Sequence, residues 1–259
     1  MKLVILAGGY GTRISEESQF KPKPMIDICG KPILWHIMKT YSHYGINDFI
    51  ICAGYKQQAI KEFFAHYYLY MSDVTFDIAN AGAKNIIHTN AEPWKVTVAD
   101  TGLNTMTGGR VKRVKDYIGN EPFLLTYGDG VCDIDIDELI KFHKQNGKMV
   151  TLTAVQPGGR FGNLEFDNSS EIKSFAEKRK EDGGWINGGF MVVEPEIFKY
   201  IAGDSSVLER DVLEKLAEKG ELCAYKYDGF WQCMDTLRDK MYLEKLIESR
   251  KAPWIKWED

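Results

Sequence analysis

A continuous apolar run near the start of the chain leads directly into a glycine-rich loop. Residues 2–7 read Lys-Leu-Val-Ile-Leu-Ala, and Gly8, Gly9 and Gly11 follow. An unbroken apolar run of this length is typical of a strand that is buried on both faces of a parallel sheet. Glycines directly after such a strand allow backbone N–H groups to approach an anionic ligand. The opening therefore predicts an α/β fold whose first loop is either a phosphate-binding loop or a plain tight turn.

The elements that follow alternate between helix and strand. The pattern predicts helices over residues 32–43, 56–69 and 137–145, and strands over residues 48–53, 122–127 and 149–155. A helix that begins at Thr107 places Val111, Val114 and Ile118 on one face. Between residues 71 and 100 only short strand-like pieces occur. This order predicts an α/β fold with a mainly parallel, Rossmann-like twisted sheet flanked by helices.

The predicted secondary-structure elements become shorter after residue 159. Shorter strands are expected at residues 164–166, 172–175, 185–193 and 222–227, and helices at 196–201, 207–219 and 236–249. We therefore expect one domain, residues 1–259, with a soft subdivision. Residues 1–156 form a nucleotide-binding half, and residues 157–259 form a smaller, β-rich half that closes over it.

Composition narrows the class of protein. Of the 259 residues, 44% are hydrophobic and 27% are charged, as in soluble globular proteins. The net charge of −4 argues against a nucleic-acid partner. No window has the length and apolar character of a signal peptide or a membrane span, so no membrane partner is expected. The five cysteines form no CxxC pair, which predicts neither a disulfide framework nor a zinc site and favours the cytoplasm.

Two cationic segments follow the glycines. Arg13 offers a planar, permanently charged fork for phosphate oxygens. Ten residues later, prolines stiffen the segment around Lys23, which can then reach the same phosphates; the alternative is a solvent-exposed basic turn. A Rossmann dinucleotide fingerprint is excluded because Ile14 stands where its third glycine belongs. A Walker A loop is excluded because Gly-Lys-Ser/Thr is absent.

These motifs resemble a known family. The run Leu-Ala-Gly-Gly-Tyr-Gly-Thr-Arg at residues 6–13, followed by Lys-Pro-Lys-Pro-Met at residues 21–25, is similar to the sugar-1-phosphate nucleotidylyltransferases. Tyr-Gly-Asp-Gly at residues 127–130 and Trp-Gln-Cys-Met-Asp-Thr at residues 231–236 follow in the family's order. The resemblance covers essentially the whole chain. Residues 71–74, 100–110 and 252–257 are most similar to the cytidylyltransferases of the family that act on glucose 1-phosphate.

The resemblance implies roles for individual residues. Nucleotide binding is expected of Leu6, Ala7, Gly8, Gly9, Gly11, Thr12, Arg13, Lys23, Thr105, Arg110 and Gly128. The residues expected to be catalytic are Arg13, Lys23 and Asp129. The sugar phosphate is expected to contact Gly162, Glu177, Lys178, Asn187 and Gly188. Arg179 stands where the family has proline.

Two carboxylates are expected to hold Mg²⁺. Asp129 follows an apolar strand, which places it at the sheet edge where ligands of such folds bind, although Asp-Gly is also common in plain turns. Asp235 can alternatively cap a helix that starts at Thr236. Spacing does not bring the two carboxylates together; the resemblance implies that they share a metal. Mg²⁺ favours one or two carboxylates with phosphate oxygens and waters.

The implied reaction joins CTP and α-D-glucose 1-phosphate to give CDP-glucose and pyrophosphate. The sugar phosphate is largely dianionic, because its second pKa is about 6, so it needs no general base to attack the α-phosphorus in line. The resemblance further implies a homo-oligomer whose product serves lipopolysaccharide O-antigen synthesis. The alternatives are a UTP- or dTTP-dependent enzyme and a non-catalytic, nucleotide-sugar-binding regulatory protein.

Overall fold

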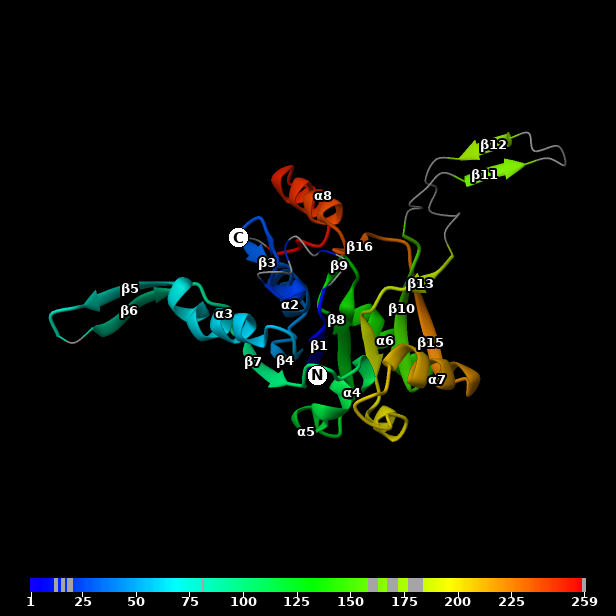
Figure 1. Cartoon of the computed structure of the whole chain (residues 1–259), viewed down its shortest axis with the longest axis horizontal. Helices are drawn as coiled ribbons and strands as arrows, with labels where there is room; N and C mark the ends of the chain where they lie inside the picture. Colours follow the sequence, from blue (N-terminus) through cyan, green and yellow to red (C-terminus); the bar gives the residue numbers. More distant parts are fainter. Residues whose placement is uncertain are drawn as a thin grey trace.

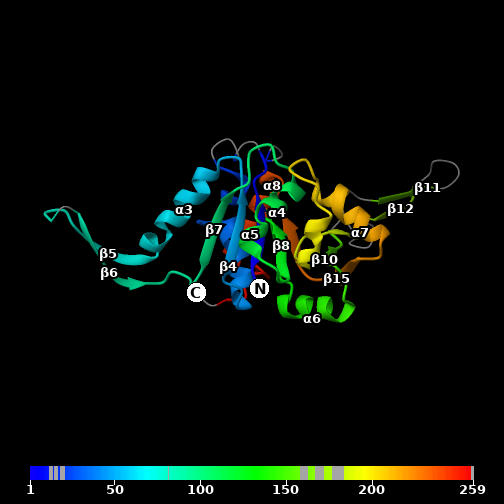
Figure 2. The same cartoon turned by 90° about the horizontal axis from the view of Figure 1, so that it is seen from below.

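The structure is a computed structural model that describes residues 1–11, 14, 17, 21–80, 82–157, 163–166, 172–176 and 184–257. For residues 83, 163–166 and 172–176 it describes the backbone alone. An eight-stranded sheet forms the centre of the molecule, and helices cover its two faces (Figure 1 and Figure 2).

Parallel strands form one half of this sheet. β1 (Leu3–Ala7) lies between β8 (Phe123–Tyr127) and β4 (Asp48–Ala53), and β7 (Lys95–Asp100) pairs with the outer side of β4. Every residue of β1 is buried. The predicted apolar strand at the start of the chain is confirmed, as is the predicted strand over residues 48–53.

The other half of the sheet is mixed. β14 (Met191–Val193) pairs antiparallel with β8 and with β10 (Val150–Val155). β10 also pairs antiparallel with β13 (Ile186–Asn187) and parallel with β15 (Leu222–Tyr227). Strands from both sides of residue 156 therefore share one sheet. The predicted fold class, a mainly parallel sheet flanked by helices, is confirmed.

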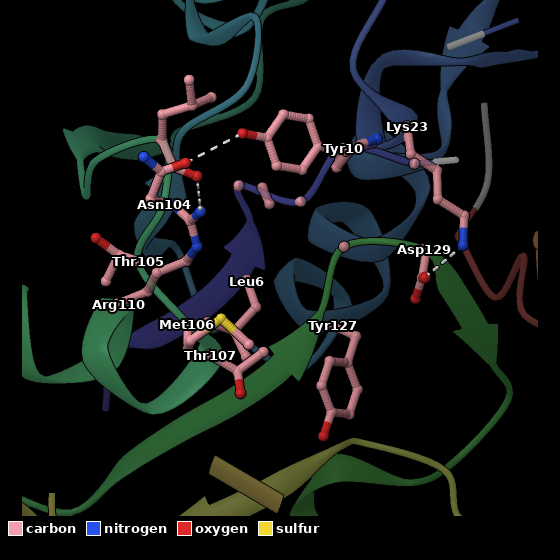
Figure 3. Close-up of a pocket in the computed structure, with 17 residues that line it drawn as sticks. Leu6, Tyr10, Lys23, Asn104, Thr105, Met106, Thr107, Arg110, Tyr127 and Asp129 are labelled. Carbon is pink, nitrogen blue, oxygen red and sulfur yellow. Dashed lines mark hydrogen bonds and ion pairs between the residues drawn. The ribbon is translucent and has the colours of Figure 1, made fainter. Parts of the chain in front are cut away.

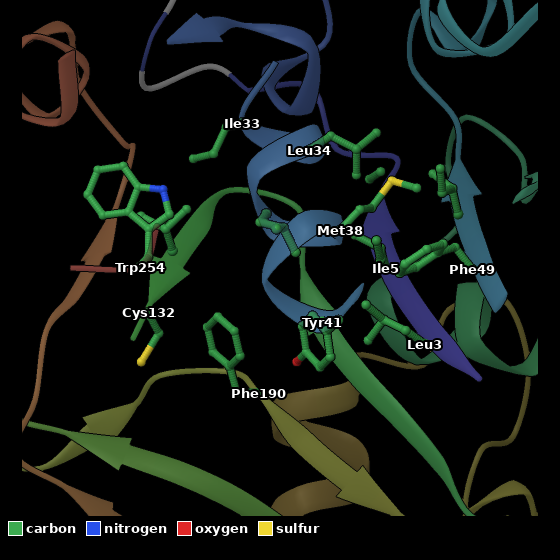
Figure 4. Packing of buried hydrophobic residues seen from close by; sticks show 14 of the residues in the cluster. Leu3, Ile5, Ile33, Leu34, Met38, Tyr41, Phe49, Cys132, Phe190 and Trp254 are labelled. Carbon is green, nitrogen blue, oxygen red and sulfur yellow. The ribbon is translucent and has the colours of Figure 1, made fainter. Parts of the chain in front are cut away.

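Successive side chains of β1 enter two separate cores, as the two-residue period of a strand requires. Leu3 and Ile5 pack beneath α2 (Ile33–His43), where Figure 4 shows them beside Met38 and Tyr41. Val4 lies on the opposite face, which α4 (Thr107–Arg113) and α5 (Lys115–Ile118) cover. Burial stabilises each such side chain by about 1.5–3 kcal/mol. Both layers therefore hold the C-terminal end of β1 in a fixed position.

Shorter elements complete the fold. The remaining helices and helical turns are η2 (Lys23–Met25), α3 (Gln57–Tyr70), α6 (Ile136–Asn146), η4 (Pro195–Lys199), η5 (Leu208–Leu213), α7 (Glu214–Glu218) and α8 (Leu237–Glu248). Four two-stranded ladders are formed by β2 (Asp27–Ile28) with β3 (Lys31–Pro32), β5 (Ser72–Asp77) with β6 (Ala83–Thr89), β9 (Gly130–Cys132) with β16 (Trp231–Cys233), and β11 (Asn163–Phe166) with β12 (Ile172–Ala176). Within the described ranges, no helix combines the length and apolar character that a membrane crossing requires.

Three predicted elements are interrupted. The helix that begins at Thr107 turns at Val114 (φ −100°, ψ 9°) and continues as α5. The strand predicted over residues 185–193 is broken into β13 and β14, because Gly189 (φ 77°) and Phe190 (φ 44°) adopt left-handed conformations. The helix predicted over residues 207–219 begins as the π-helical turn η5 before it becomes α7.

Candidate functional site

A pocket of about 560 Å³ opens at the C-terminal ends of β1 and β8, the edge at which parallel sheets bind ligands. Figure 3 shows Asn104, Thr105 and Arg110 on one side of it and Lys23 with Asp129 on the other. The structure brings residues from several distant segments of the sequence into this lining. The predicted residues among them are Leu6, Ala7, Gly8, Gly9, Gly11, Lys23, Thr105, Arg110, Gly128 and Asp129.

The glycine-rich loop passes directly over the side chain of Arg110. A Cβ added to Gly8 would lie 2.2 Å from Nη1 of Arg110, and one added to Gly54 would lie 2.5 Å from the same atom. A Cβ added to Gly9 would have no described heavy atom within 4 Å. Gly8 packs directly against the guanidinium, and Gly54 is confined by the guanidinium together with the carbonyl oxygens of Gly8 and Gly102, whereas Gly9 borders open space in the pocket.

Arg110 organises the wall of the pocket. Its Nη1 donates to Oγ1 of Thr101 and to the carbonyl of Gly102, both at 2.7 Å, and its Nη2 donates to the carbonyl of Leu103 at 3.2 Å. Burial lowers the pKa of Arg110, yet a guanidinium keeps its charge in proteins. Among the described residues, no carboxylate forms an ion pair with it. The side chain therefore braces the loop over residues 101–103 and contributes positive charge to the pocket wall; its contact with a nucleotide stays a prediction.

The opposite side of the pocket holds a lysine between two carboxylates. Nζ of Lys23 lies 2.6 Å from Oδ2 of Asp129 and 2.6 Å from Oδ1 of Asp235. The side chains of Lys23 and Asp235 are 10% and 9% exposed, and that of Asp129 is 30% exposed. Burial alone lowers the pKa of Lys23, but the charges and hydrogen bonds of the two carboxylates outweigh burial and raise it. Lys23 therefore carries a protonated, positively charged ammonium group at neutral pH.

The ladder of β9 and β16 brings the two carboxylates together. Cys233 pairs with Gly130, and the backbone N–H of Met234 donates to the carbonyl of Asp129 at 2.8 Å. The helix-cap interpretation of Asp235 is wrong, because Thr236 is the N-cap of α8 and forms a capping box with Asp239. The side chain of Asp235 is directed to Lys23 instead.

The donor set of Asp129 and Asp235 fits a divalent metal ion. Both carboxylates contact the same Nζ atom, so their nearest oxygens are separated by no more than two hydrogen-bond lengths. Mg²⁺ binds oxygen ligands at about 2.0–2.1 Å and keeps several waters or phosphate oxygens beside one or two carboxylates. In the described part of the chain, no group of three or more His, Cys, Asp or Glu residues could form a full protein cage for a metal. A metal at this pair would thus take its other ligands from phosphate and water.

The predicted sugar side is described in part. Nδ2 of Asn187 donates to the hydroxyl of Tyr127 at 3.2 Å, and the carbonyl of Gly188 accepts from Nε1 of Trp231 at 2.8 Å. Asn187 and Gly188 thus lie beyond Tyr127, next to the pocket rather than in its lining. Thr12, Arg13, Gly162, Glu177 and Lys178 lie outside the described residues, and their roles stay predictions.

Several residues of this region were not predicted from the sequence. The hydroxyl of Tyr10 donates to Oδ1 of Asn104 at 3.3 Å, so the glycine-rich loop also contacts the side of the pocket that holds Arg110 (Figure 3). Tyr127 and Thr107 line the pocket and both contact Glu209. Tyr10 and Tyr127 belong to the motifs at residues 6–13 and 127–130. Glu209 has no signal in the sequence, because it is one acidic residue in an amphipathic segment.

Comparisons with known proteins show the family of this chain. A model of the family described as "Nucleotidyl transferase" matches residues 2–259. The chain belongs to the nucleotidyl transferase family. It is 57% identical, over the full length of both chains, to the glucose-1-phosphate cytidylyltransferase of Salmonella typhimurium. It is 42% identical to the probable glucose-1-phosphate cytidylyltransferase of Bacillus subtilis, over 99% of this chain and 100% of that protein.

A solved structure supports the same membership. HddC of Yersinia pseudotuberculosis superposes with a TM-score of 0.69 at 25% identity, over 95% of this chain and 99% of that chain. The family resemblance drawn from the sequence motifs is therefore confirmed. This nucleotidyl transferase family member carries its glycine-rich loop, Lys23 and Asp129 around one pocket.

Proposed function

We propose that this chain transfers a cytidylyl group from CTP to α-D-glucose 1-phosphate and releases pyrophosphate. The observation that carries the proposal is the Lys23–Asp129–Asp235 cluster at the side of a pocket bordered by a glycine-rich loop. This arrangement suits a triphosphate, whose charge must be neutralised while its α-phosphorus stays open to attack. The choice of CTP and glucose 1-phosphate is supported by the names of the full-length relatives from Salmonella and Bacillus.

The proposed reaction is a direct displacement. An oxygen of the sugar phosphate forms a bond to the α-phosphorus of CTP, and the bond to the bridging oxygen of the β-phosphate breaks, so that pyrophosphate leaves. Mg²⁺, held by Asp129 and Asp235, would supply neutralisation of phosphate charge. Lys23 would donate to phosphate oxygens from the same side, and Arg110 would hold the loop over residues 101–103 against the bound nucleotide. The chain contributes positioning and charge rather than a general base.

A grid of nucleoside triphosphates against sugar 1-phosphates tests the proposal, with pyrophosphate release as the signal. We expect the highest kcat/KM for CTP with glucose 1-phosphate. A clear preference for UTP or dTTP would replace the nucleotide assignment and keep the reaction class. Nucleotide binding without turnover for any pair would favour the regulatory protein instead.

The cellular setting belongs to the same proposal. All five cysteines are free thiols, which supports the reducing cytoplasm as the site of the reaction. We also propose a homo-oligomer, which the hairpin of β5 and β6 supports. This hairpin extends away from the body of the molecule in Figure 1 and exposes Phe76, Ile78 and Ile87. Light scattering coupled to gel filtration should show a mass above 29.6 kDa per particle, and a Phe76→Ser/Ile87→Ser variant should lower it.

A further inference from the structure

One carboxylate outside the predicted site ties two pocket residues together. The hydroxyl of Tyr127 donates to Oε1 of Glu209 at 2.6 Å, and Oγ1 of Thr107 donates to Oε2 at 2.8 Å. Tyr127 ends β8, whereas Thr107 begins α4, and both line the pocket. Glu209 therefore connects the central strand that leads to Asp129 with the helix that carries Arg110.

The carboxylate also sets the direction of each hydrogen bond around it. An ionised carboxylate only accepts, so both hydroxyls must donate to it. The oxygen of Tyr127 is then the acceptor for Nδ2 of Asn187 at 3.2 Å. Oδ1 of Asn187 in turn accepts from the backbone N–H of Gly189 at 2.9 Å. Glu209 thus orients the amide of Asn187 through Tyr127, although it does not touch Asn187.

The proton of Tyr127 stays in place throughout the neutral pH range. Burial, followed by the charge of Glu209, raises the pKa of this hydroxyl well above its ordinary value.

The turn that carries Glu209 is also held firmly, since Oδ2 of Asp211 accepts from the backbone N–H of Val207 at 2.7 Å. The turn is π-helical, a rare conformation that often occurs at functional sites.

We propose that Glu209 is a positioning residue that orients Asn187, through Tyr127, toward a hydroxyl group of the sugar phosphate. Its second oxygen fixes Thr107 at the nucleotide side, so one carboxylate aligns both halves of the site. The amide of Asn187 keeps a second N–H that has no hydrogen-bond partner among the described residues, and this group is the one offered to the sugar. The inference rests on the proposed function.

The test uses the full chain with the substitutions Glu209→Gln and Tyr127→Phe. In the wild-type chain, the hydroxyls of Tyr127 and Thr107 both donate to Glu209. Glutamine keeps the shape of this side chain but places an NH₂ group, which is a donor, against one of the two hydroxyls. We expect KM for the sugar 1-phosphate to rise about tenfold in each variant, because each loses a hydrogen bond to a charged group. We expect kcat to change less than about threefold, and the double variant to show little more than either single loss, since the two residues act in one chain.

Two matched controls separate positioning from folding. Glu214→Gln makes the same change at an exposed position of α7 and should leave both KM values unchanged. Asp211→Asn weakens the turn itself. It should lower the melting temperature and change the KM values for both substrates by equal, small amounts. An unchanged KM in Glu209→Gln, or losses that add in the double variant, would overturn the role of Glu209.

The outcome also separates this inference from the proposed function. The wild-type grid identifies the substrate pair, and the variants are measured with that pair. If the pair is not CTP and glucose 1-phosphate, the assigned substrates fail while the role of Glu209 is still tested. Absence of turnover for every pair overturns both proposals.

Discussion

The two sides of the pocket hold their cations in opposite ways. Arg110 donates to carbonyl oxygens and to the hydroxyl of Thr101, all of which are uncharged. Lys23 lies between two carboxylates, Asp129 and Asp235, each 2.6 Å from its ammonium group. Among the described residues, the wall with Arg110 therefore keeps a net positive charge. The wall with Lys23 carries a net negative charge, because two carboxylates flank one ammonium group.

This difference suggests that the two sides of the pocket bind groups of opposite charge. Neutral acceptors fix the geometry of Arg110 without neutralising its charge, so we propose that the wall near residues 101–103 faces an anionic ligand. The two carboxylates near Lys23 exceed its charge, and this is the basis on which we propose that this side takes an additional cation such as Mg²⁺.

The largest expected effect is at the metal side. Asp235→Asn keeps the shape of the side chain and removes its charge, so we expect kcat to fall about a hundredfold or more, as when a charge-stabilising group is lost from an active site. Pyrophosphate release as a function of Mg²⁺ concentration measures the effect. Asp137→Asn, in the exposed first turn of α6, is the control and should have no effect. Near-normal, Mg²⁺-dependent turnover in Asp235→Asn would assign Asp235 to folding alone.

The close packing of Arg110 should matter next. An added Cβ at Gly54 would lie 2.5 Å from Nη1 of Arg110 and 2.8 Å from the carbonyl oxygen of Gly8. Gly54→Ala should therefore lower the free energy of unfolding by about 1–3 kcal/mol, the usual cost of overpacking. Urea denaturation measures this change. Gly9→Ala adds a methyl group in open space and should be close to neutral. Equal losses in both variants would show that close packing at Gly54 does not set the cost.

The geometry of the guanidinium can be tested separately from its charge. Arg110→Lys keeps the positive charge but cannot reach Thr101, Gly102 and Leu103 with one planar group. We expect CTP to bind about tenfold more weakly, because a hydrogen bond of a charged group is lost. Calorimetry of CTP binding measures this. Arg113→Lys on the same helix, where Arg113 forms an exposed ion pair with Asp204, should change affinity very little. Undiminished affinity in Arg110→Lys would reduce its role to one of charge alone.

The contact across the pocket mouth should have the smallest effect. Tyr10 is 47% exposed, and its hydrogen bond to Asn104 is long at 3.3 Å. Tyr10→Phe should therefore change the dissociation constant of CTP by less than about threefold, as most exposed substitutions do. Calorimetry at one temperature is sufficient to detect it. A tenfold loss would show that the Tyr10–Asn104 contact belongs to the binding machinery.

Local sequence patterns predicted individual strands and helices of this molecule, but they did not predict which distant segments pair. The apolar run of β1 and the helix over residues 32–43 are each encoded by consecutive residues, and the structure follows both predictions closely. The meeting of Asp129 with Asp235 depends on the short ladder of β9 and β16, two three-residue strands about a hundred residues apart whose pairing leaves no pattern in either segment. Family resemblance supplied that pairing. The link from Glu209 to Tyr127 spans 82 residues and was invisible for the same reason.

We propose above all that Asp129 and Asp235 form a cation site that serves the bound nucleotide. Calorimetric titration of CTP into the wild-type chain and into Asp129→Asn, each with and without Mg²⁺, tests it most directly. We predict that Mg²⁺ strengthens CTP binding to the wild-type chain and that this gain is lost in Asp129→Asn, while Asp137→Asn retains it. An equal gain from Mg²⁺ in the wild-type chain and in Asp129→Asn would contradict the account.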